Sequence, residues 1–325
     1  MANHLPDKAS TIPIVRTQNL CRSFGQTVAV SELNLEVRRG ELFGLVGPDG
    51  AGKTTTLRMM AGILEPSSGQ LWVDGISVVD EPEAIKEHIA YMPQRFGLYQ
   101  DLTVMENLIF YADLFRVPQK ERAGRIERLM AFSRLGPFKD RLAGALSGGM
   151  KQKLGLTCAL IHSPALLLLD EPTNGVDPVS RRDFWKILYD LLKQGISILV
   201  STAYLDEAER TTRVGLMDRG SVIQLGTPQE LKEMVKGVMF EIVPSNLARC
   251  RKILSGLPSI LDANVFGDGF HVRVNDEQQM DSVRKALSSE DIEISSLKKI
   301  SPSMEDAFLS LIHRRRGAGE EQSGK

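Results

Sequence analysis

Short apolar runs alternate with helical patterns along the first two thirds of the chain. Three apolar segments and then a helix-like stretch occupy residues 15–24, 33–37, 41–47 and 54–64. Two further apolar runs, at residues 165–170 and 196–201, flank an amphipathic helical pattern at 181–194. Strands interleaved with helices predict an α/β domain with a largely parallel central sheet.

The strand pattern disappears between residues 95 and 145. Apolar side chains recur there at helical spacing, in residues 104–115 and 122–135. A helical pattern also follows at 151–161, shortly before the next apolar run. This spacing predicts a helical subdomain, at about residues 95–160, inserted in the α/β domain.

A second pattern begins near residue 236. We expect strand 238–244, helix 247–257, strands 260–266 and 270–275 joined through Gly267, Asp268 and Gly269, helix 277–289 and strand 292–300. The order βαββαβ is that of a small ferredoxin-like α+β unit. A last helix is predicted to open with Ser303 as N-cap and Asp306 at N3, and to end at Arg316.

These patterns divide the chain into four predicted parts. They are a flexible N-terminus (1–13), an α/β domain (14–235), an accessory α+β domain (236–316) and a disordered tail (317–325). A length of 325 residues fits about two domains of roughly 150 residues each.

Composition narrows the class of protein. The chain has 40 basic and 41 acidic residues, a net charge of −1, and so lacks the basic excess of an electrostatically driven nucleic-acid binder. The longest apolar run, Ala165 to Leu169, is far shorter than the ~20 residues of a membrane span. No secretory leader is expected, because residues 1–10 contain neither an apolar region nor a basic region. No disulfide framework is expected, because Cys21, Cys158 and Cys250 lie far apart. We therefore expect an intracellular protein with reduced thiols.

The stretch GPDGAGKT at residues 47–54 matches the phosphate-loop pattern G-x-x-x-x-G-K-[ST], between an apolar strand and a helix. Glycines let backbone N–H groups surround phosphate oxygens, and the helix N-terminus adds partial positive charge. Lys53 is expected to pair with the β- and γ-phosphates, and the Thr54 hydroxyl to ligate Mg²⁺. The predicted nucleotide-binding residues here are Gly47, Asp49, Gly50, Ala51, Gly52, Lys53, Thr54 and Thr55. The alternative is a glycine-rich turn beside a surface lysine.

Two carboxylates, Asp170 and Glu171, directly follow the apolar run that ends at Leu169. Polar residues at the carboxyl edge of a buried parallel strand point into the crevice where such sheets bind ligands. Asp170 is predicted to hold Mg²⁺, and Glu171 to accept a proton from the water that attacks the γ-phosphate. Adjacent carboxylates are otherwise common on protein surfaces.

A second anion site is predicted where Ser147, Gly148 and Gly149 open a helix. By itself the tripeptide is typical of a flexible turn. Its place shortly before Asp170 completes a set of motifs that resembles the ATP-binding subunit of an ATP-binding-cassette (ABC) transporter. The resemblance extends from about Ile14 to Glu230 and implies a P-loop NTPase fold, with ATP and Mg²⁺ as cofactors.

The resemblance also implies roles for single residues. Phe24 matches the aromatic side chain that stacks on adenine, and Gln94 matches the glutamine that touches Mg²⁺ and links to the membrane subunit. Asp177 matches the aspartate at the dimer seam. Phe24 as a core aromatic and Gln94 as a surface amide are the alternative interpretations.

In the family, two such domains pair head-to-tail, and each LSGG segment caps the ATP bound to the opposite phosphate loop. The resemblance implies a homodimer or a heterodimer with a second ABC ATPase. It also implies an integral membrane permease as partner, and a place at the cytoplasmic face of the membrane. The accessory domain, ending in SPSMEDAFLSLI, is similar to the tail of drug- and lipid-exporting subfamilies.

Three positions depart from the family pattern. Asp49 replaces a common asparagine, which puts a carboxylate near phosphates, and Met150 replaces a glutamine on what we expect to be the outer side of its helix. Ala203 stands where the family has a histidine that contacts the γ-phosphate. Because alanine cannot hydrogen-bond phosphate, we expect slow hydrolysis in a homodimer, unless Tyr204 or a partner compensates.

The sequence also fits two alternatives to an export ATPase. One is an ATP-dependent clamp that binds ATP but scarcely hydrolyses it, as Ala203 suggests. The other is an ABC ATPase that acts on DNA or ribosomes. The cluster of cationic residues from His313 to Arg316 is interpreted as a complement to a helix dipole, or as a contact with phospholipid or RNA.

Overall fold

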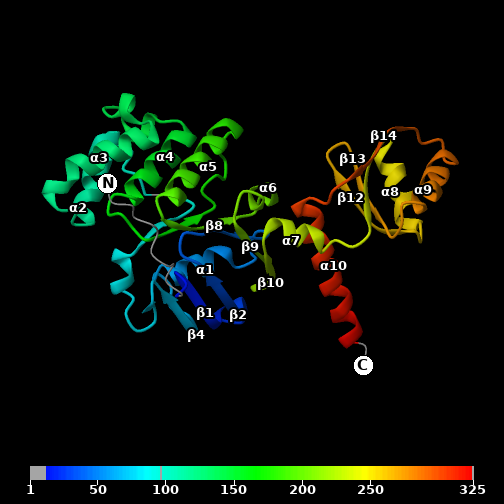
Figure 1. Cartoon of the computed structure of the whole chain (residues 1–325), viewed down its shortest axis with the longest axis horizontal. Coiled ribbons are helices and arrows are strands. Elements are labelled where there is room, and N and C mark those ends of the chain that lie inside the picture. The colour runs from blue at the N-terminus through cyan, green and yellow to red at the C-terminus, as the bar shows by residue number, and fades with distance from the viewer. Residues whose placement is uncertain (1–11, 96, 324–325) are drawn as a thin grey trace, which may run out of the picture. The chain divides into compact units, whose positions relative to one another are not determined.

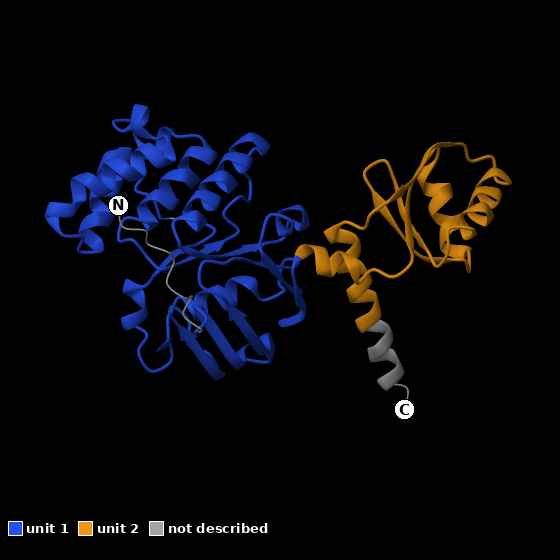
Figure 2. Cartoon of the chain, in the orientation of Figure 1, with its two compact units in different colours: residues 1–227 blue, residues 228–325 orange. Residues whose placement is uncertain are grey.

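The computed structural model describes residues 12–95 and 97–323, and it divides the chain into two compact units, residues 1–227 and 228–325 (Figure 2). The expected flexible segment 1–13 lies almost wholly outside the described residues. The division comes eight residues before the expected boundary at 235/236. The reason is that α7 (Pro228–Glu233) packs against α10 (Met304–Ser323), and Val235 joins Met239 and Ala307 in a small core.

A six-stranded sheet forms the centre of the first unit (Figure 1). Its order is β10 (Ser221–Gly226), β9 (Arg213–Asp218), β3 (Leu42–Val46), β8 (Ser197–Thr202), β7 (Leu166–Asp170) and β6 (Ile89–Met92). All neighbours are parallel except β10, which forms an antiparallel pair with β9. Every residue of β3, β7 and β8 is buried. The predicted α/β fold is confirmed, and burial on both faces explains the uninterrupted apolar runs.

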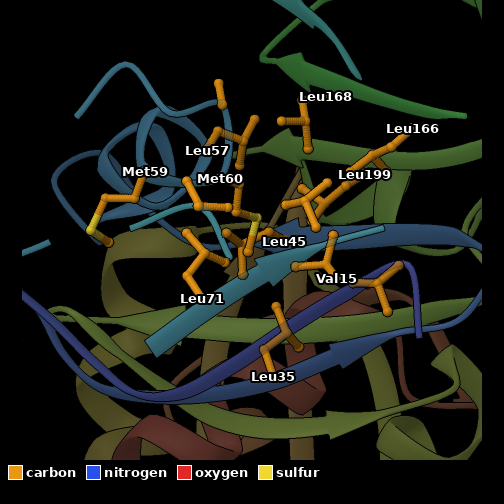
Figure 3. Close-up of a cluster of buried hydrophobic side chains, with 14 of the residues drawn as sticks. Val15, Leu35, Leu45, Leu57, Met59, Met60, Leu71, Leu166, Leu168 and Leu199 are labelled. Atoms are coloured by element: carbon orange, nitrogen blue, oxygen red, sulfur yellow. The ribbon is translucent and has the colours of Figure 1, made fainter. Parts of the chain in front are cut away.

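A separate antiparallel sheet lies beside the central one. It consists of β2 (Thr27–Val37), β1 (Val15–Phe24), β4 (Ser68–Val73) and β5 (Ile76–Ser77), in that order. Helix α1 (Lys53–Met60) contacts strands of both sheets. Figure 3 shows part of the shared core, in which Leu35 and Leu71 of the antiparallel sheet cluster with Leu57 of α1. Alternating burial in β1 and β2 shows that one face of this sheet is solvated.

The predicted helical subdomain is confirmed. It contains α2 (Val104–Leu114), α3 (Gln119–Ser133) and α4 (Gly148–Ala159), which enclose a core of their own. Thr103 and Glu106 form a reciprocal capping box that begins α2. Helices α5 (Pro178–Lys193) and α6 (Leu205–Ala208) complete the unit with short 3-10 helices at Ala84–Glu87, Gly136–Phe138 and Ala143–Ala145.

The second unit has the predicted ferredoxin-like order. After α7 come β11 (Val238–Pro244), α8 (Leu247–Gly256), β12 (Ile260–Phe266), β13 (Gly269–Val274), α9 (Gln279–Ser288) and β14 (Ile294–Ile300). The sheet order β12-β13-β11-β14 is antiparallel throughout. Apolar residues of β11 and β13, such as Ile242 and Val272, pack with Leu254 of α8 and Val283 of α9.

The last helix, α10, begins as the sequence predicts but ends later. The Ser303 backbone N–H donates to Asp306 Oδ2 (2.8 Å), and the Asp306 N–H donates to Ser303 Oγ (3.2 Å). The expected end at Arg316 is wrong, because the helix continues to Ser323. The added segment has no proline, and each glycine costs only about 1 kcal/mol relative to alanine. Of the expected disordered tail 317–325, only residues 324–325 lie outside the described residues. No described helix combines the length and the apolar composition needed to span a membrane.

Candidate functional site

The phosphate loop connects β3 to α1, and its glycines are fixed by close packing. A Cβ on Gly47 would lie 2.1 Å from the Met217 carbonyl oxygen, and one on Gly52 would lie 2.4 Å from that of Ala29. Gly52 also has a φ of +104°, a conformation that side chains rarely adopt. The backbone of this loop therefore requires glycine at both positions.

Lys53 is the first residue of α1, and its side chain is only 3% exposed. Its Nζ atom donates to the carbonyl oxygens of Gly47 (2.7 Å) and Pro48 (3.0 Å). The same atom lies 3.2 Å from Glu171 Oε1. The ammonium group is thus held between the phosphate loop and the carboxylate that follows β7.

Asp170 ends β7 with a side chain that is almost fully buried. Its Oδ1 accepts hydrogen bonds from Thr54 Oγ1 (3.0 Å) and Ser201 Oγ (2.7 Å), and its Oδ2 accepts one from the Tyr91 hydroxyl (3.3 Å). Burial raises the pKa of Tyr91 to about 12, which keeps this hydroxyl a neutral donor. Adjacent hydroxyl and carboxylate oxygens fit Mg²⁺, which takes one or two protein ligands together with water and phosphate oxygens.

Glu171 lies at the centre of a polar network. Its Oε2 accepts hydrogen bonds from Gln94 Nε2 (3.1 Å) and Asn174 Nδ2 (3.3 Å), while Lys53 approaches Oε1. Its backbone has a φ of +47°, and its N–H donates to the Ser201 carbonyl oxygen (3.1 Å). Such strained backbone is concentrated at functional sites. The structure thus brings Lys53, Gln94 and Glu171 together.

A polar cavity of about 220 Å³ adjoins this network at Ala203. It is lined by Asp49, Glu171, Thr173, Asn174, Thr202, Ala203 and Tyr204. Tyr204 is 37% exposed, and its hydroxyl approaches Asn174 Oδ1 (3.4 Å) while the Arg181 guanidinium covers its ring at 4.4 Å. Tyr204 is therefore part of the cavity wall rather than of the apolar core.

Phe24 ends β1 with a ring that is 48% exposed, which excludes its interpretation as a core aromatic. The Arg22 guanidinium lies over the ring at 4.6 Å, and Arg22 Nη1 donates to the Glu65 carbonyl oxygen (2.8 Å). One face of the ring is thus supported by an anchored cation. The exposed part of the Phe24 ring is therefore available for stacking with a planar base.

We expect Phe24→Ala to weaken ATP binding by about 5- to 150-fold, because stacking of a base on an aromatic side chain contributes about 1–3 kcal/mol. Titration calorimetry of the full chain with ATP measures the effect. Phe24→Tyr is the matched control and should bind ATP as the unaltered chain does. Equal affinities for the alanine variant and the unaltered chain would contradict the adenine-stacking role.

Two family models match the chain in sequence order. Residues 30–174 match the ABC transporter family, and residues 226–312 match the C-terminal domain of DrrA1-3-like ATP-binding proteins. The chain is 34% identical over 306 residues to Nod factor export ATP-binding protein I of Ralstonia nicotianae, an alignment that covers 93% of this chain and 94% of that protein. The chain belongs to the ATP-binding proteins of ABC transporters.

Sequence similarity to two further ATP-binding proteins supports this assignment. The daunorubicin/doxorubicin resistance ATP-binding protein DrrA of Streptomyces peucetius is 32% identical over 302 residues, with 91% of this chain and 92% of that protein covered. The probable multidrug ABC transporter ATP-binding protein YbhF of Escherichia coli is 45% identical over 298 residues, which cover 91% of this chain but 50% of YbhF. The chain thus spans about half the length of YbhF.

Solved structures of ABC proteins share the fold. An ATP-binding subunit of an ABC transporter is similar with a TM-score of 0.62 and 29% identity, over 68% of this chain and 92% of that one. CbiO1 from Clostridium perfringens, part of the ABC transporter complex cbiONQ, is similar with a TM-score of 0.64 and 27% identity. The match covers 76% of this chain and 96% of that one. The predicted P-loop NTPase fold is confirmed.

The signature segment, Leu146 to Gly149, contains the N-cap of α4, which is Ser147. Ser147 Oγ accepts a hydrogen bond from the Met150 N–H (3.3 Å), and a Cβ on Gly149 would lie 2.4 Å from Ser180 of α5. Gly148 has open space around it. A Cβ on Gly149 would also lie 3.7 Å from Val176, so the neighbours of Gly149 belong to the start of α5 and to the turn just before it. Met150 packs against the core of the helical subdomain rather than on the outer side that we expected.

Asp177 is the N-cap of α5. Its Oδ1 accepts hydrogen bonds from the N–H groups of Val179 (3.1 Å) and Ser180 (2.9 Å). Hydrogen bonds from Ser180 hold the pKa of this carboxyl below its usual value. The turn at Asp177 therefore adjoins the start of α4, because Ser180 lies close to Gly149.

Sequence reasoning missed four residues that hold the site. Tyr91 and Ser201 donate to Asp170, Asn174 donates to Glu171, and Arg22 supports Phe24. Ser201 could have been found, because it lies near the carboxyl end of β8 beside β7, where ligands bind in such sheets. Asn174 lies three positions after Glu171 and Arg22 two positions before Phe24, so both are local to their partners. Tyr91 meets Asp170 only through the pairing of β6 with β7, 79 positions away along the chain.

Proposed function

We propose that this chain binds ATP with Mg²⁺, closes into a dimer and hydrolyses ATP to drive export through a separate membrane permease. The observation that carries the proposal is the position of Glu171, whose carboxylate contacts both Lys53 of the phosphate loop and Gln94. Relatives named for multidrug transport, drug resistance and Nod factor export support transport in the outward direction.

Each group at the site has a proposed task. Lys53 pairs with the β- and γ-phosphate oxygens, and Glu171 accepts the proton of the attacking water. Thr54, Asp170 and Gln94 hold Mg²⁺, which when bound neutralises charge that develops on the phosphates. Phe24 stacks on adenine. Ser147, Gly148, Gly149 and Asp177 act on the nucleotide of the partner domain, and the open space around Gly148 leaves room for such a contact.

Exposed apolar side chains in and beside α2 support a membrane permease as partner. Tyr99, Ile109, Leu114 and Phe115 are each between 37% and 59% exposed, although they are large apolar side chains. Aromatic contacts continue along α2 from Tyr99 through Phe110 and Tyr111 to Phe115. Tyr99 lies five residues after Gln94, so a protein bound at these side chains is connected to the ATP site through a short stretch of chain.

We expect Ile109→Asp combined with Leu114→Asp to lower the recovery of a polytopic membrane protein with the tagged full chain by at least about 10-fold. Carboxylates buried in an interface without a partner weaken binding, and each 1.4 kcal/mol lost lowers the affinity about tenfold. The measurement is quantitative capture from detergent-solubilised membranes of the source cells. Ile63→Asp, at an isoleucine that is 61% exposed, is the matched control. Capture of soluble partners alone would contradict the proposal.

A second candidate function is an ATP-dependent clamp with little hydrolysis. Ala203 favours it, because the cavity beside Glu171 holds no imidazole at this position. In a heterodimer, a second ABC domain with an intact histidine would supply one competent site. The clamp and the export motor make the same contacts with ATP and differ in the rate of turnover, so the effect of restoring a histidine at Ala203 distinguishes them.

A further inference from the structure

A fully buried carboxylate lies behind the ATP site. Glu207 on α6 is 0% exposed, and a carboxylate in such a place is tolerated only when its oxygens are hydrogen-bonded. Oε1 accepts from Thr173 Oγ1 (2.6 Å) and Trp185 Nε1 (3.2 Å), and Oε2 accepts from Thr202 Oγ1 (2.7 Å). Three separate segments of the chain therefore meet at this one side chain.

Two of these donors belong to the wall of the cavity at Ala203. Thr173 lies two residues after Glu171, and Thr202 directly precedes Ala203. Thr202 also accepts a hydrogen bond from the Tyr204 N–H (3.0 Å), and its carbonyl oxygen accepts one from the Gly47 N–H (3.2 Å). A displacement of the Glu207 side chain would therefore shift Thr202 at the end of β8, and with it the start of the phosphate loop at Gly47.

The other contacts come from α5, the helix that Asp177 caps. Trp185 is buried on this helix, and Arg181 Nε lies 3.6 Å from Glu207 Oε1. The Arg181 N–H donates to the Asp177 carbonyl oxygen (2.9 Å), and its guanidinium covers the ring of Tyr204. Glu207 thus connects the turn at Asp177 with the residues around Ala203.

We propose that Glu207 is a positioning residue that couples the Asp177 turn to the γ-phosphate end of the ATP site. The inference rests on the proposed function, because it assumes that Glu171 acts on bound ATP. In this chain the coupling matters more, because the side chain of Ala203 has no group that could hydrogen-bond to phosphate. Thr173 and Thr202 then set the geometry of the cavity through the oxygens of Glu207.

We expect Glu207→Gln to lower kcat for ATP by about 10-fold, while KM changes by less than about 3-fold. An amide replaces one acceptor oxygen with a donor, so Thr173 or Thr202 loses its partner, and small misplacements of reacting groups cost rate rather than binding. Thr202→Val, which preserves shape, should give the same split. Thr157→Val removes another buried hydroxyl, on α4, and is the control.

Trp185 provides a readout that does not need turnover. The chain has two tryptophans, so Trp72→Phe leaves Trp185 as the single tryptophan emitter. We expect Mg²⁺-ATP to shift Trp185 emission in this background and the shift to disappear with Thr202→Val, at unchanged ATP affinity. A folded Glu207→Gln chain with unaltered kcat, or with its loss confined to KM, would overturn the inference, as would a persistent Trp185 shift in Thr202→Val.

The two claims fail in different ways. If the Trp72→Phe chain binds no ATP, the proposed function is wrong and the inference with it. If that chain binds ATP but turns over no faster than Glu171→Gln, the hydrolytic form of the proposed function is wrong, and the emission of Trp185 alone decides the coupling. If turnover is normal and Glu207→Gln matches it, only the inference is wrong.

Discussion

Replacing Glu171 by glutamine is expected to lower the rate of ATP hydrolysis by about 10²- to 10⁴-fold, the range that a general base contributes. The amide preserves the size of the side chain but cannot accept the proton of the attacking water. ATP affinity should change little, because Gly47, Lys53 and the rest of the phosphate loop remain. Release of inorganic phosphate at saturating Mg²⁺-ATP measures the effect.

Glu36→Gln is the matched control for this prediction. Glu36 is an exposed carboxylate on β2 that pairs with Arg16 at 3.6 Å, outside the polar network of Glu171. Hydrolysis by this variant should equal that of the unaltered chain. A Glu171→Gln chain that retains ATP binding and full turnover would show that another group activates the water.

Replacing Ala203 by histidine is expected to raise hydrolysis by the full-length chain by about 30- to 1,000-fold. A charge-assisted hydrogen bond formed in the transition state contributes about 2–4 kcal/mol, and each 1.36 kcal/mol is tenfold in rate. The position is exposed and lines the 220 Å³ cavity beside Glu171 and Asn174, so an imidazole has room there. The same phosphate-release assay gives the result.

Ala203→Leu separates chemistry from filling of the cavity. Leucine occupies a similar volume without a hydrogen-bonding group, so it should leave the slow rate unchanged. If histidine and leucine act alike, the cavity controls turnover through packing. If the unaltered chain already hydrolyses ATP as fast as Ala203→His, the segment around Tyr204 compensates for the missing imidazole.

The parts of the fold that could be predicted depend on local patterns. β3, β7 and β8 are buried on both faces, so their sequences are continuous apolar runs that indicate a parallel sheet. The separate antiparallel sheet was not predicted, because its pairing joins distant residues: Val15 pairs with both Val37 and Val73. Local periodicity indicates a strand but not its partner.

The same distinction applies to the site. Gly47 to Thr54 form a contiguous motif whose chemistry can be inferred from residue types alone. Glu207 was missed because its meaning depends on donors brought from elsewhere: Thr173 is 34 positions away along the chain. The end of α10 at Ser323 was missed because the composition of residues 317–323 resembles a flexible tail, although no proline interrupts the helix.

The most direct test of the central claim is ATP turnover by a membrane complex purified through the tagged full chain. We predict that the complex contains a polytopic membrane protein, that it hydrolyses Mg²⁺-ATP, and that the same complex made with Glu171→Gln loses this turnover by at least about 100-fold. A chain recovered without any membrane protein, or a complex whose turnover is unaffected by Glu171→Gln, would contradict the account.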